Sequence, residues 1–306
     1  MVNSRTKKAY MVPFKVVARG EPLLGLNMLL AMRLVRVSAA DVRRVLAVRS
    51  LNWDALVSQH EVLFGDDLGE IKGVRVHVRV KEGTKPVFCR ARTVPFALRE
   101  KIEETLDKAV KQGSLEKVET SEWASPTVNV PKPDGSVRVC SDFKRTVNPQ
   151  LLVDQYPQPV AEDLFAQLAG CQVFTKLDFS RCFEQLVLDE NSRSYFTINT
   201  HRGLYRHRRL PYGAALSPAV CQRTMEMILS SVKGPGKVLI FLDDILIASP
   251  TEEGLWELTA AVLKKLEEKG ARLNRKKCVF GVRKVTYLGH VISGKGLETD
   301  PTKVQS

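Results

Sequence analysis

Two kinds of hydrophobic pattern alternate along the chain and predict a mixture of helices and strands. Over residues 96–112 an apolar residue recurs every four positions and Gly113 follows, which predicts an amphipathic helix with a glycine stop. A similar pattern predicts a second helix over residues 252–269. The dipeptide Ser217-Pro218 predicts the start of a third helix, with Ser217 as its N-cap.

The strand patterns are of three kinds. Residues 74–80 alternate strictly between apolar and polar side chains, which predicts a half-exposed strand with a basic outer face. Two apolar runs flank Asp134-Gly135, a strong hairpin signal. Residues 173–179 form a strand pattern that contains the carboxylate of Asp178, and residues 285–293 are predicted to form one strand.

The most informative stretch is residues 238–248, in which two short apolar runs enclose Asp243-Asp244. The runs predict buried strands, and the two aspartates between them predict a tight hairpin turn. Adjacent carboxylates repel, and a divalent cation such as Mg²⁺ would compensate them. Taken alone, the stretch fits a solvent-exposed turn equally well.

The composition indicates which class of molecule the chain binds. The chain has 306 residues, 44% of them hydrophobic, and a net charge of +13 with a sequence pI of about 9.5. Such a balance indicates a polyanionic partner, either nucleic acid or an acidic membrane surface. Residues 22–32 form the most apolar segment, which is too short to span a bilayer.

The cysteines and the N-terminal residues indicate the cellular compartment of the protein. The six cysteines contain no C-x-x-C pair and match no zinc pattern, which indicates reduced thiols in an intracellular protein. The first eight residues are polar and basic and do not form a signal peptide. We expect a soluble cytoplasmic or nuclear protein that does not associate with a membrane; the oligomeric state does not follow from the sequence.

The order of the predicted elements brings the acidic residues together. An antiparallel sheet with helices on one face would place the Asp178 strand beside the Asp243-Asp244 hairpin. Three carboxylates at one sheet edge are what a two-metal phosphoryl-transfer site requires. Lys132 and Arg138 flank the tip of another predicted hairpin, where they would either grip a triphosphate or form an exposed basic surface.

Residues from about 66 to 305 strongly resemble the reverse transcriptase of gypsy-type LTR retrotransposons. The resemblance is carried by blocks that occur in the family's order and near its spacings. These blocks are Ser121 to Pro126, Lys132 to Arg138, Asp154 to Pro159, Leu177-Asp178, Arg209 to Gly213, Phe241 to Ile247 and Tyr287 to Ser293.

The resemblance implies an α+β fold, namely the fingers and palm of a right-hand polymerase, with an antiparallel palm sheet backed by helices. It places Asp178, Asp243 and Asp244 on the catalytic carboxylates that bind two Mg²⁺ ions, for which Mn²⁺ can substitute. Lys132 and Arg138 fall on residues that contact the incoming triphosphate. The implied partners are an RNA or DNA template with its primer and deoxynucleoside triphosphates.

The resemblance also assigns the remaining site residues. Phe183 falls on the aromatic steric gate, which collides with a ribose 2′-hydroxyl, and Tyr212 and Gly213 fall on the segment that lines the nucleotide pocket. The primer-grip hairpin, which positions the primer 3′ end, corresponds to Tyr287, Leu288, Gly289 and His290. A polymerase that makes RNA is disfavoured by the bulk of Phe183.

Four positions depart from the family pattern. Phe241 replaces the usual tyrosine of the Tyr-x-Asp-Asp box, and Leu216 replaces a common asparagine. Arg181 and Glu184 stand beside the gate where smaller or uncharged residues are usual. All three carboxylates are present, so the departures bear on the efficiency of the chemistry more than on its type.

The sequence also predicts a domain layout. Residues 1–50 resemble the C-terminal end of a retropepsin-like protease, residues 51–95 are predicted as a linker and N-terminal strand region, and residues 96–306 as fingers and palm. The chain stops before the thumb and RNase H, so we expect weak grip on its substrate. The alternative is a catalytically silent, truncated retrotransposon remnant that binds nucleic acid.

Overall fold

The computed structural model describes residues 51–154 and 156–299. The predicted protease-like segment, residues 1–50, lies outside the described residues. From Trp53 onward the chain forms one compact unit. Buried residues from the region predicted as a linker, such as Leu63 and Ile71, belong to the main hydrophobic core.

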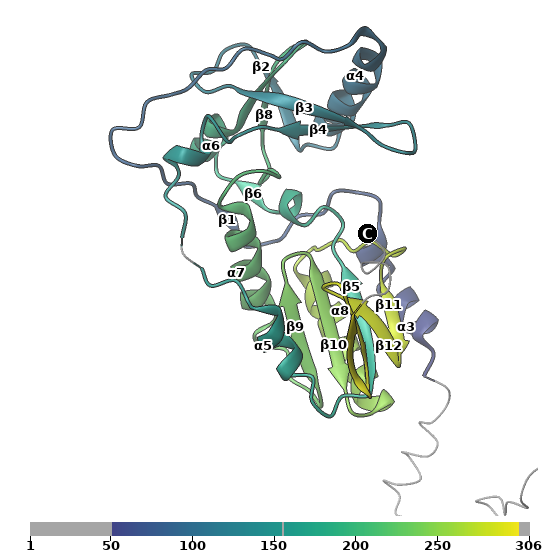
Figure 1. The fold of residues 1–306 in the computed structure, drawn as a ribbon. Coiled ribbons are helices and arrows are strands. Elements are labelled where there is room, and N and C mark those ends of the chain that lie inside the picture. The colour runs from purple at the N-terminus through teal and green to yellow at the C-terminus, as the bar shows by residue number, and fades with distance from the viewer. Residues whose placement is uncertain (1–50, 155, 300–306) are drawn as a thin grey trace, which may run out of the picture. The chain divides into compact units, whose positions relative to one another are not determined.

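The helices and strands follow one another in a mixed order (Figure 1). The helices are α3 (Trp53–Gln59), α4 (Phe96–Lys111), α5 (Ala161–Ala166), α6 (Glu190–Arg193), α7 (Ser217–Leu229) and α8 (Glu252–Glu268). Single 3-10 turns are η1 (Glu61–Phe64), η2 (Asn148–Gln150), η3 (Cys182–Gln185) and η4 (Ser194–Phe196). The strands are β1 (Arg75–Val76), β2 (Leu115–Val118), β3 (Ser125–Pro131), β4 (Val137–Ser141), β5 (Val173–Asp178), β6 (Val187–Leu188), β7 (Thr197–Thr200), β8 (Gly203–His207), β9 (Lys237–Phe241), β10 (Asp244–Ser249), β11 (Val279–Val282), β12 (Lys284–Tyr287), β13 (His290–Ser293) and β14 (Gly296–Thr299).

An antiparallel four-stranded sheet has the order β11-β5-β10-β9. Side chains of β10 alternate between its two faces, as the strand period requires. Ile245 and Ile247 pack into the core that includes residues of α7 and α8. Leu246 and Ala248 pack in a second cluster with residues of α5 and the β12–β13 hairpin. The sheet is therefore covered on both faces, which makes it a stiff platform for the residues at its ends.

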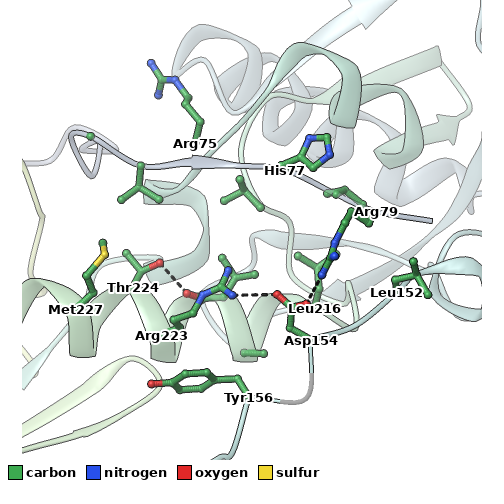
Figure 2. Close-up of a pocket in the computed structure, with 16 residues that line it drawn as sticks. Arg75, His77, Arg79, Leu152, Asp154, Tyr156, Leu216, Arg223, Thr224 and Met227 are labelled. Carbon is green, nitrogen blue, oxygen red and sulfur yellow. Dashed lines mark hydrogen bonds and ion pairs between the residues drawn. The ribbon is translucent and has the colours of Figure 1, made fainter. Parts of the chain in front are cut away.

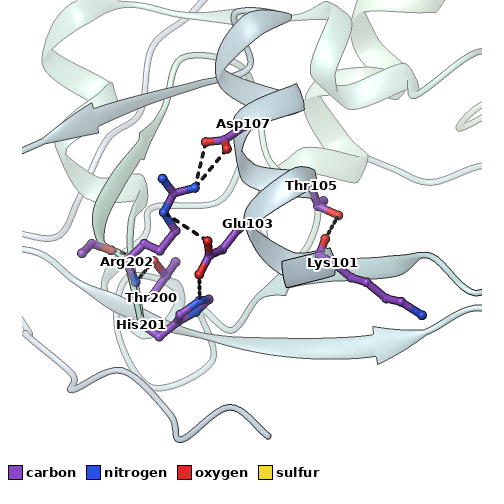
Figure 3. Close-up of polar contacts among 8 residues, drawn as sticks. Lys101, Glu103, Thr105, Asp107, Thr200, His201 and Arg202 are labelled. Carbon is purple, nitrogen blue, oxygen red and sulfur yellow. Dashed lines mark hydrogen bonds and ion pairs between the residues drawn. The ribbon is translucent and has the colours of Figure 1, made fainter. Parts of the chain in front are cut away.

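A five-stranded sheet has the order β2-β8-β7-β3-β4 and carries α4. Figure 3 shows how α4 is fastened to the turn between β7 and β8. The Arg202 guanidinium donates to both carboxylate oxygens of Asp107 at 3.0 Å, and His201 Nε2 lies 3.1 Å from Glu103 Oε1. The helix predicted over residues 96–112 is confirmed.

Two local predictions were wrong. Leu216, not Ser217, is the N-cap of α7, because the Ser217 hydroxyl donates to the Pro211 carbonyl at 2.7 Å. The segment predicted as a single strand over residues 285–293 is a hairpin of β12 and β13. Its two-residue turn, Leu288-Gly289, has positive φ angles of 49° and 78°, which suits a tight hairpin.

His207 on β8 is a half-buried imidazole. Its Nε2 lies 2.9 Å from the Ser141 hydroxyl, and its ring packs edge-on against Phe143. Burial lowers the pKa of His207 from 6.5 to about 4. Between these values the unfolded chain binds a proton that the folded chain does not, so the free energy of unfolding decreases as the pH falls.

Because of His207, we expect the free energy of unfolding to fall by up to about 3 kcal/mol as the pH is lowered from 6.5 to 4. Denaturant unfolding at a series of pH values measures it, and His207→Gln should flatten the pH dependence over this range. His77→Gln is the matched control, since the His77 side chain is exposed. An unchanged pH slope in His207→Gln would refute the assignment.

Candidate active site

The turn between β9 and β10 differs by one residue from the predicted one. Phe241 pairs with Asp244, so Asp244 is the first residue of β10 and the turn consists of Leu242 and Asp243. The predicted Asp243-Asp244 turn is therefore wrong in register. Leu242 has a φ of 54°, a left-handed conformation that is uncommon for a leucine.

A buried glutamine of α7 holds this turn. The Gln222 side-chain oxygen accepts a hydrogen bond from Leu242 N at 2.8 Å, and its amide nitrogen donates to Ile240 O at 2.9 Å. Gln222 is fully buried, so water does not compete for either of these hydrogen bonds. These two bonds compensate for the strained backbone and fix the direction in which the aspartates point. The sequence analysis missed Gln222, because its role depends on a contact between distant segments.

Gln222→Leu should disturb the turn between β9 and β10. Because a buried N–H and a buried carbonyl lose their partners, we expect a loss of about 2–3 kcal/mol in the free energy of unfolding. The nucleotide incorporation that the resemblance implies should fall by more than the stability explains, measured where both proteins are fully folded. Gln167→Leu, the same change at an exposed glutamine of the chain, is the control. Full incorporation by Gln222→Leu would mean that the turn does not need this support.

The three aspartates lie at the same end of the four-stranded sheet. Asp178, the last residue of β5, is directly opposite Asp244 on β10. Phe179 N donates to the Asp243 carbonyl at 3.0 Å, which fastens the turn to the end of β5. Asp178 is only 7% exposed, whereas Asp243 is exposed. The structure thus brings the predicted carboxylates to one edge.

Two lysines neutralise part of this charge. Lys176 Nζ lies 3.1 Å from Asp244 Oδ1, and Lys277 Nζ lies 3.4 Å from Asp178 Oδ2. Burial raises the pKa of the Asp178 carboxyl, the Lys277 ammonium opposes this rise, and the charge of Asp244 adds to it. Burial likewise raises the pKa of Asp244, against the effect of Lys176. The site is therefore short of positive charge even with both lysines in place.

The donor set fits a hard divalent cation. Asp178 Oδ1 is buried and has no hydrogen-bond partner, which is costly unless a cation or water satisfies it. Carboxylate oxygens are the ligands that Mg²⁺ prefers. Within residues 51–154 and 156–299, no three acidic, histidine or cysteine side chains converge as a finished ligand group.

The predicted gate, Phe183, lies on η3 and packs on Tyr212. Their ring centroids are 4.7 Å apart at an angle of 47°. Gly213, next to Tyr212, has a φ of 88°, and a Cβ there would lie 3.0 Å from the Ser141 carbonyl oxygen. The predicted pocket residues Phe183, Tyr212 and Gly213 are therefore gathered in one place, and only glycine fits the last position without strain.

The loop that carries Phe183 is held by Gln185, another residue that the sequence analysis missed. The Gln185 amide nitrogen donates to Ser180 O at 2.6 Å and to Arg272 O at 2.8 Å, and its oxygen accepts from Arg272 N at 2.8 Å. Gln185 is fully buried. The gate is thereby fixed to the segment that follows α8.

The unusual charged residues beside the gate interact with each other. Arg181 has a φ of 53° and donates to the Gln112 side-chain oxygen at 2.7 Å. Its guanidinium lies 3.7 Å from Glu184. Burial raises the pKa of Glu184, and the charges of Arg181 and Arg209 oppose this. The two departures from the family pattern therefore compensate each other.

Lys132 and Arg138 lie on the β3–β4 hairpin, in a different sheet from the aspartates. The Lys132 backbone N–H donates to Ser136 O at 2.8 Å and closes the tip of the hairpin. No ion pair is recorded for either side chain within the described part of the chain. Among the described residues, both cations are therefore available to bind an anion.

The predicted primer grip is the tip of the β12–β13 hairpin. Tyr287 pairs with His290, and Leu288 and Gly289 form the turn between them. Tyr287 is fully buried in the cluster under the four-stranded sheet, and the His290 ring packs against Phe165. This packing fixes the hairpin relative to the four-stranded sheet.

The four-stranded sheet, which carries three carboxylates at one end, and the separate five-stranded sheet, which carries Lys132 and Arg138, correspond to the palm and fingers of a right-hand polymerase. The chain belongs to the reverse transcriptase family. The family model described as "Reverse transcriptase (RNA-dependent DNA polymerase)" matches residues 130–292. The predicted α+β fold, with its antiparallel palm sheet backed by helices, is confirmed.

Individual relatives agree with this assignment. The chain is 33% identical over 231 residues to an uncharacterized protein of Caenorhabditis elegans, covering 75% of this chain and 18% of that one. It is 31% identical over 232 residues to the retrovirus-related Pol polyprotein from transposon 412 of Drosophila melanogaster, covering 74% and 18%. The chain therefore spans about 18% of the length of these relatives.

A solved structure shares the fold. The foamy viral protease-reverse transcriptase in complex with an RNA/DNA hybrid superposes with a TM-score of 0.75 at 21% identity, over 88% of this chain and 36% of that one. Among the described residues, no helix is long and apolar enough to cross a membrane.

Proposed function

We propose that the chain is the polymerase core of an RNA-directed DNA polymerase from a gypsy-type retrotransposon. It adds deoxynucleotides to a primer 3′-hydroxyl by phosphoryl transfer. The observation that carries the proposal is the pairing of Asp178 with Asp244 at the sheet edge, beside the exposed Asp243. Membership of the reverse transcriptase family supports it.

The three aspartates would hold two Mg²⁺ ions, or Mn²⁺ in their place. When bound, such ions supply charge that activates the primer hydroxyl and stabilises the leaving pyrophosphate. The burial of Asp178 and the left-handed backbone at Leu242 fix the positions of the carboxylates before substrate arrives. Electrostatic catalysis needs this preorganisation.

The remaining residues bind and select the substrates. The free cations Lys132 and Arg138 bind the triphosphate, Lys132 as a point charge and Arg138 as a planar fork. Phe183, backed by Tyr212 and Gly213, excludes the 2′-hydroxyl of a ribonucleotide. The hairpin tip of residues 287–290 positions the primer end. The template would be RNA or DNA, as the foamy viral enzyme is described with an RNA/DNA hybrid.

The second candidate is a silent nucleic-acid-binding remnant. The ion pairs of Lys176 with Asp244 and Lys277 with Asp178 favour it, because they neutralise two carboxylates without any metal. The basic chain would still attract nucleic acid through its charge.

Primer extension distinguishes the two candidates. The chain is incubated with a DNA primer on an RNA template, the four deoxynucleotides and either Mg²⁺ or a chelator. We expect elongation in the presence of Mg²⁺ and no elongation in the presence of the chelator. Binding of the duplex without elongation under any divalent ion would favour the remnant and contradict the enzyme.

A further inference from the structure

The short strand β1 has an edge that is only partly paired. On one side it pairs in parallel with β6, where the Asp189 N–H donates to the Val76 carbonyl at 3.0 Å. Backbone groups of successive residues in a strand point to opposite edges. The N–H and C=O groups of Arg75 and His77 therefore face the edge opposite β6.

On that opposite edge, backbone pairing with another segment begins only farther along the chain, at Arg79. Leu152 N donates to the Arg79 carbonyl at 2.9 Å, and Val80 forms an antiparallel bridge with Leu151. No backbone hydrogen bond on this edge is recorded for Arg75 or His77 in the described part of the chain. The edge thus offers donors and acceptors in the extended spacing of a strand, with no strand beside them.

A pocket of about 510 Å³ lies along this edge. Figure 2 shows it between the segment that carries Arg75, His77 and Arg79 and the helix α7, which carries Arg223 and Met227. Its rim contains Leu152 and Met227, which are 47% and 58% exposed. The volume is in the range of ligand-binding clefts, and exposed apolar side chains at a rim are typical of interaction sites.

The lining of the pocket is basic. Arg79 and Arg223 converge on one carboxylate, that of Asp154, at 2.5 and 2.9 Å. Arg75 adds a third guanidinium to the lining, although it pairs with Glu70 outside the pocket at 2.8 Å, and Asp154 is the only acidic residue of the lining. A single carboxylate cannot saturate the donors of two guanidinium groups, so the pocket retains donors for further anions.

We propose that this groove binds an extended acidic segment of a partner polypeptide as a strand added to the free edge of β1. Backbone groups of Arg75 and His77 would pair with it, acidic side chains would contact Arg79 and Arg223, and apolar ones would pack on Met227. The phosphate backbone of a nucleic acid is a poorer match, because phosphates only accept hydrogen bonds and cannot pair with the exposed carbonyls at the spacing of a strand. The groove uses the outer face of α7, whereas Gln222 on the same helix holds the catalytic turn.

The probe is a fluorescein-labelled nine-residue peptide in which glutamate and valine alternate, with binding to the full chain followed by fluorescence anisotropy. We expect saturable binding that Arg79→Glu/Arg223→Glu weakens on the order of tenfold or more. The matched control is Arg99→Glu/Lys101→Glu, an equal change of charge on the exposed face of α4, which should leave binding unchanged. Equal weakening by both pairs would show non-specific attraction and overturn the proposal.

A second set of variants tests the backbone pairing. His77→Pro removes the N–H on the free edge, which has no backbone partner among the described residues, and should abolish binding, whereas His77→Ala should not. The peptide with N-methyl groups on alternate amides should also fail to bind. Binding that survives both changes, or a single-stranded oligonucleotide that displaces the peptide and depends on the same arginines, would contradict strand addition.

Discussion

Asp178→Asn is expected to reduce nucleotide incorporation by on the order of a thousandfold or more without lowering stability. Asp178 is buried opposite Asp244, and burial raises its pKa. The ionised carboxylate therefore lowers the stability of the folded protein. Asparagine keeps the shape of the side chain and removes that charge. Activity and the free energy of unfolding should therefore move independently.

Asp189→Ala is the control for Asp178→Asn, because Asp189 is an N-cap whose carboxylate accepts from Ser192 N at 2.7 Å. Loss of this cap should cost about 1 kcal/mol of stability and leave incorporation intact at temperatures where the chain is folded. Incorporation assays and denaturant titrations on both variants form the test. An active Asp178→Asn would remove this residue from the catalytic site.

Phe183→Ala is expected to lower the preference for deoxynucleotides over ribonucleotides by on the order of a hundredfold. The Phe183 ring packs 4.7 Å from Tyr212, and Gln185 fixes the loop that carries it. Removing the ring opens space at the position where a 2′-hydroxyl would otherwise collide. The measurement is the ratio of the two kcat/KM values for each protein.

Phe183→Tyr retains the ring and should retain the selectivity, which separates loss of bulk from general damage to the pocket. A lower rate with both sugars at an unchanged ratio would show that Phe183 supports the fold but does not act as the gate. A lower ratio in both variants would point to the edge of the ring, where tyrosine carries its hydroxyl, rather than to its bulk.

Much of the fold followed from periodicity, because its long helices have clear apolar faces. The four-residue repeat predicted α4 within one residue of its end, and Asp134-Gly135 predicted the β3–β4 hairpin. The pattern of residues 238–248 drew attention to Asp243 and Asp244 but fitted an exposed turn equally well, and the resemblance to reverse transcriptases decided in favour of a metal site.

The errors arose where distant contacts decide the local structure. The turn at Leu242-Asp243 needs a left-handed leucine, which local preference disfavours and Gln222 stabilises from α7. Gln185 acts through Arg272, far along the chain, and Lys277 finds Asp178 only in the folded sheet. No spacing rule identifies such pairs, so Gln222, Gln185 and Lys277 were missed, whereas the three aspartates that they surround were named from the sequence.

The most direct test of the central claim is single-nucleotide incorporation on an RNA template with Mg²⁺, comparing the native chain with Asp243→Asn/Asp244→Asn. Circular dichroism and duplex binding establish that both proteins are folded and hold the substrate. The native chain should extend the primer by the templated deoxynucleotide, and the double variant should bind the duplex without extending it. Equal extension by both proteins would contradict a catalytic role for these aspartates.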